Sequence, residues 1–121
     1  MRGILDLVRA NGVIVDFKTI KATPNPDLVL HQNETQLTAY ALLYREATGH
    51  HEQGLELHHL VKNKSPKLVV TAAGPASDRQ KTRFLKTVES YVAGLSRKDI
   101  VPSPGLQCAA CEFLGECRAW P

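Results

Sequence analysis

Two aspartates and one lysine near the start of the chain have the residue types and spacing of a metal-dependent hydrolytic site. Asp6 and Asp16 each lie in an apolar run with strand character, and Lys18 lies two residues beyond Asp16. Side chains along a strand alternate between its faces, so Asp16 and Lys18 share one face. Carboxylate oxygens bind Mg²⁺ or Mn²⁺, and an ammonium can orient an attacking water or neutralise developing charge. The set therefore predicts the hydrolysis of phosphodiester bonds.

Two strands joined by a tight turn must position these residues. The apolar runs are residues 3–8 and residues 13–19, and the turn between them contains Asn11-Gly12, the strongest short-range signal for a β-hairpin. Paired strands lie about 5 Å apart, so carboxylates on both can converge on one ion. Asp and Lys near strand ends also occur by chance, and that alternative stays open. Against it, the charges interrupt a run that otherwise looks buried, and buried charge is costly unless it is paired or metal-bound.

A helix is predicted from Asn33 to about residue 47, where Gly49 stops it. Its apolar positions recur at the spacing of one helix face that packs on the sheet: Leu37, Tyr40, Ala41 and Tyr44. Gln36 and Tyr40 are four residues apart and therefore stack on one face. The structural alternative is that Asn33 and Gln36 form a capping box and that Tyr40 is an ordinary core aromatic.

In this order, the motifs resemble those of the PD-(D/E)XK nuclease superfamily, in the branch of RecB-like exonucleases that includes AddB-type subunits and CRISPR-adaptation exonucleases. The motifs that carry the resemblance are Gly-Ile-Leu-Asp at 3–6, Val-Asp-Phe-Lys-Thr at 15–19, Gln36-x-x-x-Tyr40 and Cys108-x-x-Cys111-x5-Cys117. The resemblance implies a restriction-endonuclease-like α/β sandwich with a mixed sheet flanked by helices. It also implies a Mg²⁺- or Mn²⁺-dependent DNA exonuclease that acts in DNA repair or recombination.

The resemblance assigns a role to each matched residue of the hairpin. It implies that Asp6 and Asp16 are metal ligands and that the backbone carbonyl of Phe17 completes the protein's share of the coordination. It implies that Lys18 positions the nucleophilic water. Spacing alone supports only that these groups can meet and that their chemistry suits a hard cation and a phosphate.

DNA is the partner that the resemblance implies, as a single strand or as a duplex end. In the family, the residues that match Gln36 and Tyr40 lie beside the active site and contact the DNA. Residues 62–86 hold seven basic residues and one acidic residue, which suits a phosphate backbone, although a solvated helix face is an equal alternative without the nuclease motifs. The candidate backbone contacts are Lys62, Lys64 and Arg83. A helicase or another recombination subunit is a further expected partner.

Three cysteines lie within ten residues near the end of the chain: Cys108, Cys111 and Cys117. No secretory signal is present, which argues against a disulfide framework. Thiolates select zinc or iron–sulfur clusters, and three are one short of the four that either site normally has. Iron–sulfur members of the resembled branch have a fourth, upstream cysteine, so we expect a 4Fe–4S cluster in the parent protein, with zinc or free thiols as alternatives. The pairs His50-His51 and His58-His59 could complete a zinc site, but we expect them to be solvated.

The rest of the chain predicts two more strands, at residues 54–62 and 67–71, and a long helix. Ser77 caps this helix with Gln80 at the capping-box position. Its apolar stripe is predicted to be core and consists of Phe84, Val88, Tyr91, Val92 and Leu95. The resulting order, β-β-α-β-β-α, indicates an α/β fold with a mixed sheet.

The part of the family's fold that the resemblance covers predicts a truncated domain. Family members carry an N-terminal helical region that contributes a further metal ligand, and nothing precedes Gly3 to supply one. We therefore expect that the N-terminal part of the fold is missing. Residues 1–101 would form the nuclease core, and residues 102–121 an irregular cysteine-rich cap.

Composition sets the outer limits of these interpretations. The chain has 121 residues, an apolar content of 43% and a net charge of +3, which suits one globular domain. No apolar run approaches the ~20 residues that a membrane span requires, so we expect a cytoplasmic protein with no membrane partner. Three classes of function stay open: a metal-dependent deoxyribonuclease, a nuclease-fold module that grips DNA ends without cutting, and a structural domain held by a metal.

Overall fold

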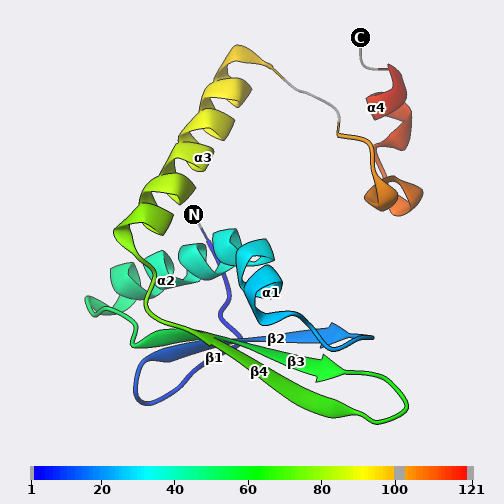
Figure 1. The fold of residues 1–121 in the computed structure, drawn as a ribbon. Coiled ribbons are helices and arrows are strands. Elements are labelled where there is room, and N and C mark those ends of the chain that lie inside the picture. The colour runs from blue at the N-terminus through cyan, green and yellow to red at the C-terminus, as the bar shows by residue number, and fades with distance from the viewer. Residues whose placement is uncertain (1, 100–102, 120–121) are drawn as a thin grey trace. The chain divides into compact units, whose positions relative to one another are not determined.

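The computed structural model describes residues 2–99 and 103–119. The chain forms two compact units, Met1–Lys86 and Thr87–Pro121. The first unit contains the sheet and the helices packed on it, and the second contains the end of the long helix and the cysteine segment (Figure 1). The domain boundary predicted at residues 101 and 102 lies outside the described residues.

A mixed sheet of four strands forms the first unit. Its strands are β1 (Leu7–Val8), β2 (Val13–Ile20), β3 (Gly54–Val61) and β4 (Lys67–Ala73), in the order β1-β2-β3-β4. The β2–β3 pair is parallel, and the pairs on either side of it are antiparallel. The predicted mixed sheet and α/β class are therefore confirmed. The parallel pair requires a crossover connection, which the helices between β2 and β3 provide.

The predicted hairpin forms, but its first strand is shorter than expected. Gly12 has φ +81° and its N–H donates to the carbonyl of Arg9 at 2.8 Å, which closes the turn. The prediction of a strand from residue 3 is wrong, because β1 contains only two residues. The ladder ends at Asp6, where the side-chain carboxylate, and not a strand carbonyl, accepts the N–H of Phe17 at 2.9 Å.

The predicted helix is present as α2 (Glu34–Thr48), and Gly49 ends it with φ +73°. A second helix, α1 (Pro26–Gln32), precedes it and was not predicted. The signal for α1 was present in the sequence, because Asn25 followed by a proline at the first helical position is a typical helix start. The Asn25 side chain accepts the N–H groups of Asp27 and Leu28 at 3.0 and 3.3 Å.

The two helices cover one face of the sheet (Figure 1). The core between the two layers is made by Ile14, Val29, Leu37, Ala41, Leu55, Leu57 and Ala76, with Tyr40 and Tyr44 packed against it. The predicted apolar stripe of α2 is therefore confirmed. It fixes which side of α2 faces the sheet, and so where Gln36 and Tyr40 lie.

A buried ion pair holds the chain segments at one end of this core. Arg45 on α2 donates from Nε and from its terminal nitrogen to the two oxygens of Glu52, both at 2.8 Å. Glu52 also accepts the N–H of Ala76 at 2.7 Å, and Arg45 donates to the Ala76 carbonyl at 2.8 Å. The pair thus joins α2, the segment before β3 and the segment after β4.

The long helix is α3 (Asp78–Arg97), and its predicted capping box is confirmed. The N–H of Gln80 donates to the Ser77 hydroxyl at 3.3 Å, and the Gln80 side chain accepts the N–H of Ser77 at 2.9 Å. The prediction that its apolar stripe is core is wrong, because none of its described residues is buried. An amphipathic pattern identifies the apolar side of a helix, but not whether another element covers that side.

The cysteine segment contains a 3-10 helix, η1 (Leu106–Ala110), and a short helix, α4 (Leu114–Ala119). It therefore has more regular structure than the expected irregular cap. Among the described residues, no helix combines the length and the apolar character that a crossing of a bilayer demands.

Candidate active site

Asp16 and Lys18 lie together on the face of β2 that α1 and α2 cover. The Asp16 side chain is 3% exposed, and its Oδ2 lies 2.9 Å from Nζ of Lys18, which is 31% exposed. The predicted shared face is therefore confirmed. The aspartate is buried in the layer between sheet and helix, while the ammonium beside it still reaches solvent.

Gln36 joins this pair to α2. Its Oε1 accepts from Nζ of Lys18 at 2.7 Å, and its Nε2 donates to Oδ1 of Asp16 at 3.2 Å and to the Tyr40 hydroxyl at 2.8 Å. The capping-box alternative for Gln36 is wrong. Asn33 follows α1 directly, and its side chain donates to the carbonyl of Val29 at 2.8 Å instead of capping α2. Gln36 is thus free to bind the hairpin residues.

The two oxygens of Asp16 differ in their surroundings. Oδ1 accepts the hydrogen bond from Gln36, whereas the buried Oδ2 has the ammonium of Lys18, at 2.9 Å, as its partner among the described residues. A carboxylate oxygen can accept more than one contact. Oδ2 therefore keeps the capacity to bind a cation.

Asp6 and Phe17 meet at the edge of β2 that faces β1. The N–H of Arg9 donates to the carbonyl of Val13, so the odd-numbered residues of β2 turn their backbone polar groups toward this edge. Phe17 follows the same alternation, and its N–H donates to Oδ2 of Asp6 at 2.9 Å. The structure therefore brings the Asp6 carboxylate and the Phe17 backbone to one edge, next in sequence to Asp16.

His59 lies beside Lys18 but was not predicted from the sequence as a residue of this site. In the parallel β2–β3 pair it is the direct partner of Lys18, and it is 2% exposed, with no hydrogen bond to its Nδ1 from the residues that the structure describes. Burial lowers the pKa of His59, the charge of Lys18 lowers it further, and Asp16 opposes both. The neutral ring is therefore favoured. No local sequence signal could have found it, because its position depends on the register of two strands that are distant in sequence.

His58 faces the opposite side of the sheet. Its Nε2 lies 2.7 Å from Oε2 of Glu56, which also pairs with Arg9 at 2.8 Å, and the Phe17 ring meets the imidazole edge-on at 5.4 Å. The expectation that His58 and His59 are solvated is wrong, because both are buried in the structure. Among the described residues, no group of three or more His, Cys, Asp or Glu side chains is arranged to hold a metal.

The candidate DNA contacts divide into two groups. Lys62 and Lys64 are exposed in the connection after β3, and the N–H of Lys62 donates to the carbonyl of Ile20 at 2.7 Å. This places them at the end of the sheet toward which β2 runs after Lys18. Arg83 instead forms an ion pair with Glu34, the first residue of α2, at 2.6 Å. Arg83 is thus a neighbour of the helix that carries Gln36.

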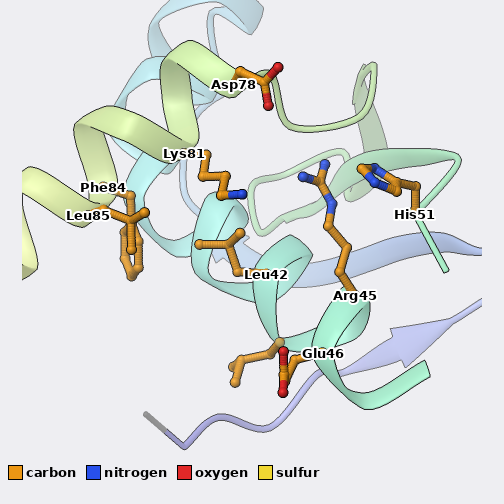
Figure 2. Close-up of a pocket in the computed structure, with 9 residues that line it drawn as sticks. Leu42, Arg45, Glu46, His51, Asp78, Lys81, Phe84 and Leu85 are labelled. Atoms are coloured by element: carbon orange, nitrogen blue, oxygen red, sulfur yellow. The ribbon is translucent and has the colours of Figure 1, made fainter. Parts of the chain in front are cut away.

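A cavity of about 700 Å³ between α2 and the start of α3 lies apart from these residues (Figure 2). Its lining is partly apolar, with Leu42 and Phe84, and partly charged, with Arg45 and Lys81. None of the residues predicted for the site lines it. The cavity is therefore separate from the residues predicted for the site.

The three cysteines are free thiols. Cys108 accepts the N–H of Gly105 on its sulfur at 3.3 Å, and Cys111 is exposed. They do not form a metal-binding group among the described residues. The predicted iron–sulfur or zinc site stays a prediction.

Comparison with protein-family models supports the resemblance at the level of the superfamily. A family model described as the PD-(D/E)XK nuclease superfamily matches residues 1–118. No curated protein and no solved structure matches the chain.

Proposed function

Because the chain belongs to the PD-(D/E)XK nuclease superfamily, whose members are typically metal-dependent nucleases, we propose that it is a deoxyribonuclease that cleaves DNA from its ends. The reaction takes place at the site formed by Asp16, Lys18 and Gln36. The enzyme belongs to the RecB-like branch and acts in DNA repair or recombination, together with a helicase or another recombination subunit.

The observation that carries this proposal is the arrangement around Asp16. One oxygen of a buried carboxylate pairs, at 2.9 Å, with the ammonium of a lysine that still reaches solvent. Among the described residues that ammonium is its one partner, so the oxygen can also take a cation. Gln36 holds the carboxylate and the ammonium in a fixed relation through hydrogen bonds to both.

The donor set suits Mg²⁺ or Mn²⁺, because both ions prefer oxygen ligands. The groups that would hold the ion are the carboxylates of Asp6 and Asp16 and the carbonyl of Phe17. When bound, such an ion polarises the phosphate and lowers the pKa of a bound water.

The side chains of this chain have separate tasks in the proposed reaction. Lys18, held by Gln36, orients the attacking water and neutralises charge that develops on the phosphate. Tyr40 holds the amide of Gln36 at 2.8 Å, so it fixes the amide that orients Lys18. Lys62 and Lys64, at the end of the sheet beyond Lys18, supply contacts to the DNA backbone that do not depend on sequence.

The cysteines are not assigned a step in this reaction. The three free thiols are one short of the four ligands of a 4Fe–4S cluster and do not converge among the described residues. They do not fit the cluster as they stand.

A pair of lysine variants tests the proposal. Purified protein is incubated with end-labelled single-stranded and duplex DNA and Mn²⁺, and the release of short products is measured. We expect Lys18→Met to lower the rate by about 100-fold or more, which is the usual scale for a group that acts on the reacting atoms. Lys21→Met removes an equal charge from an exposed position on the same segment and should leave the rate within about twofold, since that lysine touches none of the site residues.

Two results would contradict the proposal. Cleavage by Lys18→Met at the rate of the unchanged chain would exclude this site. Salt-dependent binding to DNA ends without cleavage at any metal concentration would instead identify a module that grips DNA without cutting it.

A further inference from the structure

We propose that His59 is a positioning residue for Lys18, and that its Nδ1 offers the ammonium an acceptor on the neighbouring strand that can replace Asp16. The inference rests on the proposed function of Asp16 and Lys18. It adds a residue that none of the hairpin or helix motifs contains.

The strand register brings His59 beside Lys18. The two residues are direct partners in the parallel β2–β3 pair, and adjacent strands lie about 4.8 Å apart. Both side chains lie on the face covered by α1 and α2, because they alternate with Phe17 and His58, which meet on the other face. Lys18 and His59 are therefore lateral neighbours in the same buried layer.

The burial of His59 leaves one of its nitrogens without a partner. The residue is 2% exposed, and Nδ1 forms no hydrogen bond with any described group. Buried polar atoms almost always have a hydrogen-bond partner, so an exception calls for an explanation. Burial also favours the neutral ring, which carries a lone pair on one nitrogen.

Lys18 needs such an acceptor if Asp16 is to bind a cation. An ammonium has three N–H donors. The ammonium of Lys18 makes two contacts, with Oε1 of Gln36 at 2.7 Å and with Oδ2 of Asp16 at 2.9 Å. A cation at Oδ2 of Asp16 repels the ammonium from that oxygen. With its ring proton on Nε2, His59 accepts a hydrogen bond from Lys18 on Nδ1, and Lys18 stays in the site while Asp16 is released.

A second unpartnered atom in the layer does not have this geometry and provides the control. Thr71 on β4 is 5% exposed and its hydroxyl has no partner. It pairs with Leu57, which in turn pairs with Asp16, so a buried leucine separates Thr71 from the aspartate. Burial and an unused polar atom are common to both residues, but only His59 is the neighbour of Lys18.

Three substitutions of His59 separate the acceptor from the ring. Asn places an oxygen at the position of Nδ1, Gln places one at the position of Nε2, and Phe keeps a ring without an acceptor. We expect His59→Phe and His59→Gln to lower kcat for DNA cleavage by about 10- to 100-fold with little change in KM, which is the scale of a misplaced catalytic group. His59→Asn should recover kcat to within severalfold, and Thr71→Val should leave it unchanged. A kcat of His59→Phe equal to that of the unchanged chain would overturn the proposal.

Nitrogen NMR of the imidazoles tests the contact without any cleavage. As Mg²⁺ is added to the unchanged chain, the Nδ1 signal of His59 should move toward the value of a nitrogen that accepts a hydrogen bond. The same titration of Lys18→Met should leave that signal in place. An Nδ1 signal that moves equally in both proteins would exclude Lys18 as the donor. If the chain does not cleave DNA, the proposed function fails, whereas this titration still decides whether His59 accepts from Lys18.

Discussion

Glu52 and Asp16 are two buried carboxylates in the same compact unit, but their surroundings differ. Glu52 is fully buried, and both of its oxygens accept hydrogen bonds, from Arg45 and from the N–H of Ala76. Asp16 is almost as buried, yet among the described residues its Oδ2 has a single partner, the ammonium of Lys18. Both carboxylates carry an ion pair, so the presence of a buried pair does not identify a functional site. What distinguishes Asp16 is that its Oδ2 has one partner, on a lysine that still reaches solvent.

The pKa values of the Arg45–Glu52 pair agree with a structural role. Burial is the largest single effect on Glu52 and raises its pKa, but the hydrogen bonds from Arg45 and from the backbone N–H groups of Ala76 and Glu52, with the charge of Arg45, together outweigh it, so the pKa is lowered. The hydrogen bond to Glu52 raises the pKa of Arg45. Both groups therefore stay charged, and every polar atom that they bury is directed at a partner within the fold.

The largest expected effect in this comparison is the loss of stability when the Arg45–Glu52 pair is broken. Glu52→Gln keeps the shape of the side chain but removes the hydrogen-bonded counter-charge from the guanidinium of Arg45, which is 14% exposed. Breaking one partner of a buried pair typically costs about 3–5 kcal/mol. Urea denaturation followed by circular dichroism measures the free energy of unfolding.

A double substitution shows whether the loss comes from the unpaired charge. Arg45→Met combined with Glu52→Leu removes both charges and should recover part of the lost stability. If Glu52→Gln alone unfolds at the same urea concentration as the unchanged chain, the assignment of this pair to the fold is wrong.

How far the sequence predicted these two sites depends on the range of the interactions. The hairpin, the apolar face of α2 and the shared face of Asp16 and Lys18 follow from local periodicity, and the structure confirms them. The contacts of Gln36 with β2 needed the family resemblance, because local rules favoured a capping box.

The remaining features depend on pairings between distant segments. His59 meets Lys18 only through a parallel register, and Glu52 meets Ala76 across 24 residues of chain. Period-two alternation does predict that His58 and His59 face opposite sides of a strand, but not which side holds the site. Likewise, the pattern correctly identified the apolar stripe of α3. The pattern alone could not predict that this stripe is not buried.

The second prediction concerns the carboxylate of Asp16. Asp16→Asn should change the free energy of unfolding by less than about 1 kcal/mol in the absence of metal, because Lys18 reaches solvent and its charge can be hydrated. The same substitution should abolish the stabilisation by Mn²⁺, which for the unchanged chain is about 2.7 kcal/mol at a concentration 100-fold above Kd. Thermal unfolding with and without Mn²⁺ measures both quantities.

An exposed aspartate serves as the matched control for this substitution. Asp27→Asn on α1 removes an equal charge and should retain the full Mn²⁺ shift. A Mn²⁺ shift that persists in Asp16→Asn would mean that Oδ2 of Asp16 is not a metal ligand. The contrast with Glu52 would then have no functional meaning.

The smallest expected effect is the pH dependence of stability that His59 contributes. Its pKa is lowered in the folded chain, mainly by burial, so the folded state binds fewer protons than the unfolded state below about pH 6.5. Stability should therefore fall as the pH drops from about 6.5 toward the lowered pKa of the folded state, with a slope of at most about 1.4 kcal/mol per pH unit.

His59→Asn should remove this slope, whereas His31→Gln, which removes an exposed imidazole, should leave it. Urea denaturation between pH 7 and pH 5 measures the slope for each protein. Equal slopes for His59→Asn and the unchanged chain would show that the buried layer beside Lys18 admits a proton freely. The neutral acceptor proposed for Lys18 would then lack its physical basis.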